Sequence, residues 1–408
     1  MLKKILLVAL LPVTMLIIIL KPIIFLRIIK LHGNVYGHFL QETLLYLSYL
    51  EKNKSPRSLL NINLFFLSSK QIVSQEILKL WKREIKIFPH FKLIDLIIFN
   101  LNYLIKSKIF SPQILWYDHL HLVDKYEVKK FKFNKHEKLK LLNELQQNNI
   151  NIEKHDKWIC INNRDNEWSN HYFEKFNNTN KKFNEKYIED QQFRNNSIEK
   201  MGDAVNFFLD QGYMVFRTGK VSSGKLNIKH KKYHDLTKIK CSEALQIYLL
   251  SNTKFYFGAE GGLRWLPRIF KRNISTINSP EIITEMLYSY NETFPFLPKK
   301  IILKNNKKVL TLKEIFDQQF YRKPPDWKIN FSNVYFEENS SAEILSLAKE
   351  ISYHHLDKMP LSKEDQNLKK RYLKIVNDNC PRINNFNPQY NKLTISLNYL
   401  KKNEFLLN

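Results

Sequence analysis

The hydrophobic positions between residues 157 and 278 fall into short apolar runs separated by longer amphipathic segments. Short runs rich in β-branched and aromatic residues predict strands, whereas apolar residues that recur every three or four positions predict helices. The predicted strands are WICINN (158–163), YMVFR (213–217), KFYFG (254–258) and ISTI (274–277). Strands that alternate with helices in this way are typical of a parallel α/β sheet.

The helices between these strands have recognisable ends. The segment 198–211 is apolar on one side, and we expect Asn196 or Ser197 to cap its start and Gly212 to end it. Further helices are expected over 242–251, 263–271 and 279–290. By contrast, the segment 165–195 is rich in Asn, Lys and aromatic residues and is interpreted as a long loop.

The first half of the chain shows the same alternation less clearly. Strands are predicted over 22–31 and 62–69, each followed by residues with helical spacing, and 114–123 is a candidate strand. The charged residues 125–156 are interpreted as the link between the two halves. Beyond about residue 300 the pattern weakens, and within the polar tail 360–408 the segment PRINNFNPQYNK (381–392) is expected to be irregular.

The N-terminus carries an uncharged apolar run from Ile5 to Leu20. As a helix it would be ~24 Å long, slightly short for a membrane span. We expect residues 1–21 to form an uncleaved membrane anchor or a monotopic helix, and the alternative is a buried core helix. The basic residues that follow the run favour a cytoplasmic location for the rest of the chain.

The composition indicates a folded protein with an anionic partner. Hydrophobic residues make up 44% of the 408 residues, and the net charge is +26, which suits a phosphate-bearing substrate or an acidic lipid surface. Much of this charge could equally be solvated surface, and no nucleic-acid motif is present, so no nucleic-acid partner is expected. The three scattered cysteines, Cys160, Cys241 and Cys380, fit a reducing compartment.

Three arginines lie near predicted strand ends or a helix start. Arg164 and Arg217 end strands, and Arg194 precedes a helix. A guanidinium donates two parallel hydrogen bonds to neighbouring oxygens, which suits a diphosphate. The alternative for each arginine is a surface ion pair.

A glycine-rich turn, GAEGG (258–262), follows the third strand of this half and precedes a helix. Gly258, Gly261 and Gly262 would allow backbone N–H groups to approach a phosphate at the helix N-terminus. Glu260 would repel a phosphate, so it is expected to bind a ribose or sugar hydroxyl or to cap the helix, with Arg264 offsetting its charge.

His38 and Glu42 lie four residues apart, on one face of the first long helix. Either side chain could act as a general base, although a packed histidine beside a solvated glutamate is the alternative interpretation. No HExxH, no acid pair beside a histidine and no serine nucleophile elbow is present, so a metal-independent mechanism without a cofactor is expected.

The segments RDNEW, FRNNSIEKMGDAVNFFLDQGYMVFRTGK, HDLTKIKCSEALQIYLL and GAEGGLRWLPRIF, together with GNVYGHFLQE near the N-terminus, resemble a family of bacterial glycosyltransferases. These are found with surface-polysaccharide genes and are related to the fucosyltransferase-like group of the GT-B fold. The resemblance covers roughly residues 25–50 and 158–290. It implies two Rossmann-type domains across a cleft and transfer of a sugar from a nucleotide diphosphate sugar to a glycan or lipid-linked acceptor.

The resemblance also implies a division of the chain and of the roles. After the membrane helix, 22–150 would be the acceptor-side domain, 151–300 the donor domain and 301–408 a helical or irregular extension. His38 or Glu42 would deprotonate the acceptor. The residues expected to bind the donor phosphates are Arg164, Arg194, Arg217, Gly258, Gly261 and Gly262. Those expected to bind its nucleoside or sugar are Gly219, Asp235, Ser242 and Glu260.

The sequence departs from the family pattern at several of these positions. Asn162 replaces a common histidine, Thr218 a methionine, Gln246 an acid, and Glu260-Gly261 the usual hydroxyl-bearing residues. These departures motivate an alternative hypothesis, in which the chain is a non-enzymatic, membrane-attached basic module that binds an anionic glycan or lipid.

Overall fold

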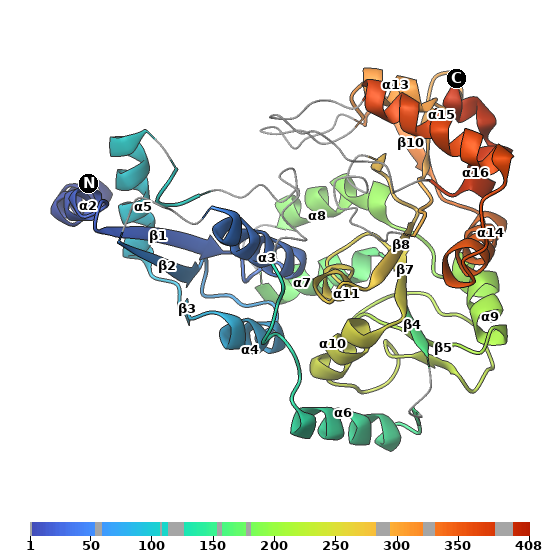
Figure 1. The fold of residues 1–408 in the computed structure, drawn as a ribbon, viewed down its shortest axis with the longest axis horizontal. Coiled ribbons are helices and arrows are strands. Elements are labelled where there is room, and N and C mark those ends of the chain that lie inside the picture. The colour runs from blue at the N-terminus through green and yellow to red at the C-terminus, as the bar shows by residue number, and fades with distance from the viewer. Residues whose placement is uncertain are drawn as a thin grey trace. The chain divides into compact units, whose positions relative to one another are not determined.

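The computed structural model describes residues 2–53, 59–106, 108–112, 126–152, 157–176, 181–282, 294–320, 331–379 and 395–408. The chain is a mixed α/β protein with parallel sheets (Figure 1). It divides into two compact units, Met1–Phe133 (unit 1) and Asn134–Asn408 (unit 2). The boundary lies within the charged link expected at 125–156, and residues 301–408 lie in unit 2.

Unit 1 is built on a three-stranded parallel sheet. Its strands, in spatial order, are β1 (Ile24–Leu31), β2 (Leu60–Leu67) and β3 (Ile87–Phe88). The helices that connect them are α3 (Tyr36–Lys52) and α4 (Gln75–Glu84). The predicted strand, helix, strand, helix order of this half is confirmed. The candidate strand at 114–123 lies outside the described residues.

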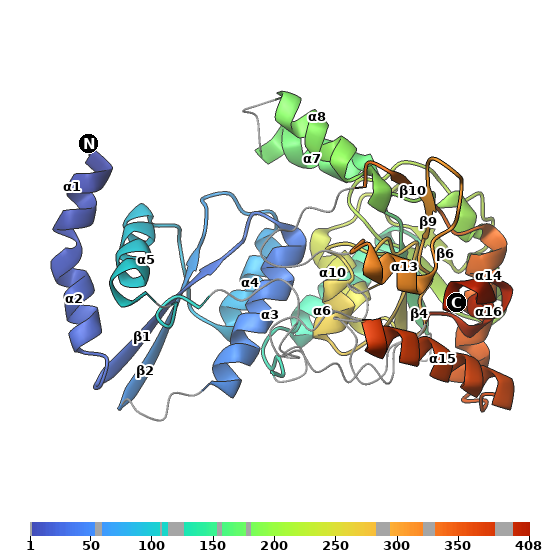
Figure 2. The same ribbon diagram turned by 90° about the horizontal axis from the view of Figure 1, so that it is seen from above.

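The N-terminal apolar run forms two short helices, α1 (Leu2–Ala9) and α2 (Leu11–Ile19), with Pro12 in the first turn of α2. They pack beside α5 (Lys92–Ile105), as Figure 2 shows. The side chains that join α2 and α5 to the sheet surround Phe25 and Ile28 of β1. Among the described residues, none of the helices combines the length and the apolar character that a membrane crossing needs.

Unit 2 is built on a five-stranded parallel sheet. The strands in spatial order are β6 (Tyr233–Asp235), β5 (Met214–Arg217), β4 (Trp158–Asn162), β7 (Phe255–Ala259) and β8 (Asn273–Ile277). All four predicted strands are confirmed, and β6 is an addition. The chain runs from β4 outward to β6, returns to β7 beside β4, and continues to β8, so the strand order reverses between β4 and β7.

The helices of this sheet are α9 (Gly202–Asp210), α10 (Glu243–Asn252) and α11 (Trp265–Ile269). Gly212 follows α9 with φ = +85°, as expected for the residue after a helix end. The predicted cap at Asn196 or Ser197 is wrong, because the side-chain oxygen of Asn196 accepts instead from the backbone N–H of Arg164. Most of the helix predicted at 279–290 lies outside the described residues.

The interpretation of 165–195 as a long loop is wrong, and the charged link 125–156 is partly helical. The supposed loop 165–195 contains α7 (Asn166–Phe176), α8 (Lys181–Asp190) and a 3₁₀ turn at Gln192–Arg194. The charged link contains α6 (Lys135–Gln147), which packs against α10. The helices in these two segments were not predicted because the segments are polar. A helix needs only a narrow apolar stripe to pack against its neighbours.

The last part of unit 2 covers α9 with further helices. A two-stranded antiparallel ribbon, β9 (Lys300–Leu303) and β10 (Val334–Glu337), precedes α14 (Ser341–Glu350), which packs against α9. The remaining helical segments are α13 (Leu312–Asp317), a π-helical turn (Ile351–Leu356), α15 (Lys363–Asn379), α16 (Leu397–Lys402) and a final 3₁₀ turn (Glu404–Leu407). The segment 381–392, which was expected to be irregular, lies outside the described residues.

Candidate functional sites in the two units

The first candidate site lies where β1 ends and α3 begins in unit 1. His32 directly follows β1, and Gly33 follows it at a point where a Cβ atom would lie 2.9 Å from the Leu67 side chain. His38 lies in the first turn of α3, and Glu42 one turn later on the same face. The carboxyl end of a parallel strand is the usual place for a ligand in an α/β sheet.

Glu42 holds both histidines. Its Oε2 lies 2.5 Å from Nδ1 of His32, and its Oε1 lies 2.6 Å from Nδ1 of His38. The Glu42 side chain is buried, whereas the two imidazoles are partly exposed. The predicted pairing of His38 and Glu42 is present, and His32 joins it as a residue that the sequence reasoning missed. Its position immediately after a strand and before a glycine was the available signal.

The electrostatics of this cluster favour an ionised Glu42. Burial alone would raise the pKa of Glu42, but its hydrogen bonds with His32 and His38 outweigh burial and lower that pKa to about 2. The hydrogen bond to Glu42 in turn raises the pKa of His32, against the opposite effect of burial. An ionised carboxylate can only accept, so Nδ1 of each ring is the protonated donor. In a neutral imidazole held in this way, Nε2 is the basic atom.

The second candidate site lies at the carboxyl ends of the strands in unit 2. The strand order reverses between β4 and β7, where Asn162 is paired with Gly258. A Cβ atom at Gly258 would lie 2.5 Å from the backbone oxygen of Asn162, so only glycine fits. In open parallel sheets the ligand crevice lies outside the strand ends at such a reversal. The predicted residues after β4 and β7 therefore meet at the expected edge.

Arg217 lies in this region and is fully buried, and both of its terminal nitrogens, Nη1 and Nη2, donate hydrogen bonds. Its Nη1 donates to Asp235 (2.9 Å) and to the Gly224 carbonyl (3.0 Å). Its Nη2 donates to Asn163, to Ser222 and to the Ser223 carbonyl, at 2.7 to 3.1 Å. In this conformation the guanidinium ties together the ends of β4, β5 and β6 and the loop that follows β5.

Arg194 and Glu260 form an ion pair beside the reversal point. Nε of Arg194 donates to the Glu260 carboxylate, and its Nη1 donates to Gln191 at 3.1 Å. Lys299 adds a second cation near Glu260, and its Nζ donates to the Asn195 carbonyl. Glu260 therefore has Arg194 as a counter-charge.

Lys299 is the second residue that the sequence reasoning missed. Burial lowers the pKa of Lys299 to about 8, even though the carboxylates of Glu338 and Glu260 act in the opposite direction. A lysine that loses its proton near neutral pH is a common feature of functional sites. Lys299 follows a stretch of the chain without a clear pattern, so only the fold brings it to Glu260.

The other residues predicted to bind the sugar donor stabilise the loops at the carboxyl end of the unit 2 sheet. Gly219 has φ = +133°, which favours glycine, and its N–H donates to Gln246 at 2.9 Å. Asp235 accepts from Arg217 and from Thr237, at 2.9 and 2.6 Å. Ser242 caps α10.

Two of the positions that depart from the family pattern bridge neighbouring strands. Nδ2 of Asn162 donates to the Thr218 carbonyl at 2.9 Å, and the Thr218 N–H donates to Ile161 at 2.9 Å. Asn162 and Thr218 therefore join the ends of β4 and β5. Gln246 has a related role, since its side chain holds the turn at Gly219.

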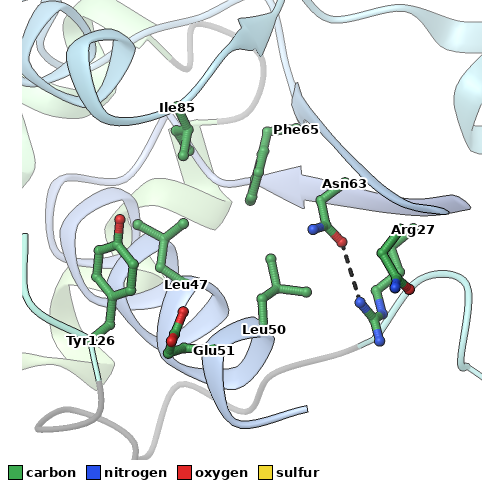
Figure 3. Close-up of a pocket in the computed structure, with 9 residues that line it drawn as sticks. Arg27, Leu47, Leu50, Glu51, Asn63, Phe65, Ile85 and Tyr126 are labelled. Carbon is green, nitrogen blue, oxygen red and sulfur yellow. Dashed lines mark hydrogen bonds between the residues drawn. The ribbon is translucent and has the colours of Figure 1, made fainter. Parts of the chain in front are cut away.

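The remaining groups of the described residues add little to these two sites. No set of three His, Cys, Asp or Glu side chains with metal-binding geometry occurs among the described residues. A cavity of about 280 Å³ in unit 1 is lined by Leu47, Phe65 and Ile85, with Arg27 donating to Asn63 at 3.4 Å on its polar side (Figure 3). None of the residues predicted to be functional lines it.

No protein-family model and no curated protein matches the chain. Among solved structures, the chain is similar to the ADP-heptose lipopolysaccharide heptosyltransferase II of E. coli, with 9% identity, a TM-score of 0.37 and coverage of 64% of this chain and 86% of that one. It is similar to a family 9 glycosyl transferase from Veillonella parvula, with 9% identity, a TM-score of 0.38 and coverage of 68% and 87%.

It is also similar to the iron-containing dodecameric glycosyltransferase TibC from enterotoxigenic E. coli, with 12% identity, a TM-score of 0.34 and coverage of 71% and 64%. These proteins are all glycosyltransferases, and none is described as fucosyltransferase-like.

Proposed function

We propose that the chain is a glycosyltransferase that moves a sugar from a nucleotide diphosphate sugar to a hydroxyl group of a glycan or lipid-linked acceptor. The observation that carries the proposal is the arrangement of Glu42 with His32 and His38. A buried carboxylate that orients imidazoles with exposed rings is the geometry of general base catalysis. A module that only binds an anion does not need oriented histidines of this kind. The arrangement therefore favours an enzyme over the non-enzymatic alternative.

Unit 2 is proposed to bind the donor diphosphate. Arg194 offers five N–H donors, and among the described residues Nε and Nη1 have partners that hold the side chain in place. Its remaining donors can bind a phosphate oxygen, together with Arg164 and with backbone N–H groups of Gly261 and Gly262. Lys299 adds positive charge. These fixed cations would stabilise the negative charge that develops on the leaving diphosphate, a role that needs no metal ion.

Arg217 and Asp235 are proposed to shape the site instead of contacting the donor phosphates. Because the Arg217 guanidinium already donates to five acceptors, a phosphate would have to displace several buried partners. Its proposed role is to hold the loop after β5 in place. Gly219, Ser242 and Glu260 are still proposed to bind the nucleoside or the sugar of the donor.

Unit 1 is proposed to supply the base. Nε2 of His38 accepts the proton of the acceptor hydroxyl as its oxygen forms a bond to the anomeric carbon. The bond from that carbon to the diphosphate oxygen breaks, and its electron pair leaves with the nucleoside diphosphate. His32, whose pKa is raised by its hydrogen bond to Glu42, is proposed to carry the positive charge that balances the carboxylate. In this proposal unit 1 serves the acceptor and unit 2 serves the donor, the division of roles expected of a GT-B-type transferase in polysaccharide synthesis.

The proposal is tested by measuring the binding of UDP, GDP, ADP and CDP to the full-length protein by thermal shift. At ~100 times its dissociation constant a ligand should add ~2.7 kcal/mol of stability. The double variant Arg194→Gln, Glu260→Gln removes the cation and its ion-pair partner together. It should abolish the shift produced by the preferred nucleotide.

The matched control removes another Arg–Glu pair of unit 2, the exposed pair of Arg371 and Glu404. The double variant Arg371→Gln, Glu404→Gln should bind the nucleotide like the wild type. If no nucleotide binds to the folded protein, or if both double variants bind equally well, the proposed donor site is wrong. Nucleotide binding without any transfer or hydrolysis of the matching nucleotide sugar would favour the non-enzymatic module.

A further inference from the structure

Helix α2 of unit 1 is apolar on all sides, yet part of it is exposed. Its sequence, LPVTMLIII, contains no charged residue, and its inner side packs through Thr14, Ile17 and Ile18 against the rest of unit 1. Its outer side exposes Val13, Leu16 and Ile19. A surface helix of a water-soluble domain is polar on its outer side, so an apolar outer side indicates a non-aqueous neighbour.

Helix α5 presents the same kind of surface. It packs beside α1 and α2, and the side-chain N–H of Asn100 donates to the Leu7 carbonyl at 2.9 Å. Its exposed side carries Phe99 and Tyr103, with their rings stacked, followed by Leu104. Tyrosine and other aromatic side chains are enriched where a protein meets the headgroup region of a bilayer.

The charges around these helices have one predominant sign. No acidic residue precedes Glu42 in the chain, whereas Lys4 and Lys21, both exposed, flank the two N-terminal helices. Around α5, Lys92 and Lys106 are exposed. The acid of this helix, Asp95, is paired with Lys30 at 2.7 Å. A second copy of the chain would bring like charges together, whereas an anionic lipid surface would attract them.

We propose that the helix pair formed by α1–α2 and α5 binds the surface of an anionic phospholipid bilayer. Its exposed apolar side chains would enter the headgroup and upper acyl region, and the surrounding lysines would contact lipid phosphates. The inner sides of both helices belong to the core of unit 1, so only their outer sides can meet lipid. The helices therefore lie on the bilayer. This surface does not depend on the proposed transferase activity.

The test is flotation of the full-length protein with two kinds of vesicle, phosphatidylcholine alone and an equal mixture of phosphatidylcholine and phosphatidylglycerol. The wild type should float with the mixed vesicles. Ile19→Asp and Tyr103→Asp, at side chains that are 66% and 73% exposed, should each weaken that binding about tenfold or more. Lys21→Gln and Lys106→Gln should each weaken it about fivefold.

The matched control is Leu139→Asp on α6, a leucine of unit 2 that is 52% exposed. It should float like the wild type, and circular dichroism should show that all variants are folded. Failure of the wild type to float, or equal binding to both kinds of vesicle, would overturn the proposal. So would binding that Ile19→Asp abolishes but Tyr103→Asp leaves unchanged, because α5 would then take no part. A dimer that Ile19→Asp dissociates, without vesicle binding, would assign the surface to a second copy.

Discussion

Nδ1 of His32 lies 2.5 Å from Oε2 of Glu42, ten residues away in the chain. His32 follows a strand and Glu42 lies on the next helix, so the turn between them brings the two side chains together. Because the same carboxylate also holds His38, one buried acid orients two imidazoles. This cluster is the centre of the proposed chemistry, and its two histidines are expected to differ in their contribution.

Replacement of His38 by Asn should lower kcat for the sugar donor identified by nucleotide binding. Loss of a positioned general base typically costs about 10²- to 10⁴-fold in rate, and KM should change little because the donor binds to unit 2. His32→Asn should lower kcat less than His38→Asn does, since it removes only the charge that balances Glu42. A larger decrease in kcat for His32→Asn than for His38→Asn would show that His32, and not His38, is the general base.

Glu42→Gln should destabilise the protein in a pH-dependent way. The pKa of Glu42 is lowered to about 2, so its contribution is present above the unfolded-state value of ~4.3 and is lost as pH falls through the folded value. The pKa of His32 is raised, so its contribution is full below ~6.5 and is lost as pH rises through its folded value.

The difference between wild type and Glu42→Gln should therefore be largest between about pH 4.5 and 6.5. A pKa that is lowered by between two and three units corresponds to roughly 3 kcal/mol. Urea unfolding of both proteins across this pH range measures the difference. A difference that is independent of pH would show that Glu42 contributes by packing alone.

Arg217→Lys should destabilise unit 2 although it keeps the charge. Lysine has three donors on one nitrogen and cannot reach the five acceptors that the guanidinium serves. Leaving buried acceptors without donors should cost about 3 kcal/mol, measured by urea unfolding. The matched change Arg371→Lys, at an exposed pair, should stay within about 0.5 kcal/mol. Equal effects of the two changes would contradict the network role.

Gly258→Ala and Gly202→Ala should have opposite effects on stability. At Gly258 the new methyl group would lie 2.5 Å from a backbone oxygen of Asn162, which should cost about 1–3 kcal/mol by overpacking. At Gly202, the first residue of α9, the nearest atom lies 3.9 Å away and the backbone is helical, so alanine should add up to about 1 kcal/mol. Thermal unfolding of the two variants compares them directly, and a neutral Gly258→Ala would disprove the close strand contact.

The affinity for the nucleoside diphosphate should decrease as pH rises through about 8. Burial lowers the pKa of Lys299 to about 8, so its positive charge is present below that pH and lost above it. Calorimetric titration between pH 7 and pH 9 should show this decrease in the wild type and not in Lys299→Met. An identical pH dependence in both proteins would exclude Lys299 from the donor site.

The sequence by itself determined the longer strands of both sheets and the helices between them, but not the short strands β3 and β6. Apolar strand runs such as 158–163 and 254–258, and helices with regular spacing such as 198–211, are local patterns. They predict the structure because burial of one face follows directly from the order of the residues. The pairing of His38 with Glu42 was equally local, since residues four apart share a helix face.

Only the tertiary structure decided which side chains meet across the chain. Glu260 is paired with Arg194 and lies near Lys299, because loops from separate elements converge at one edge of the sheet. Burial of Arg217 among five acceptors and the packing of α5 beside α2 are also long-range contacts. Charge and hydropathy along the chain show what each residue can do, but a partner distant in sequence is chosen by packing.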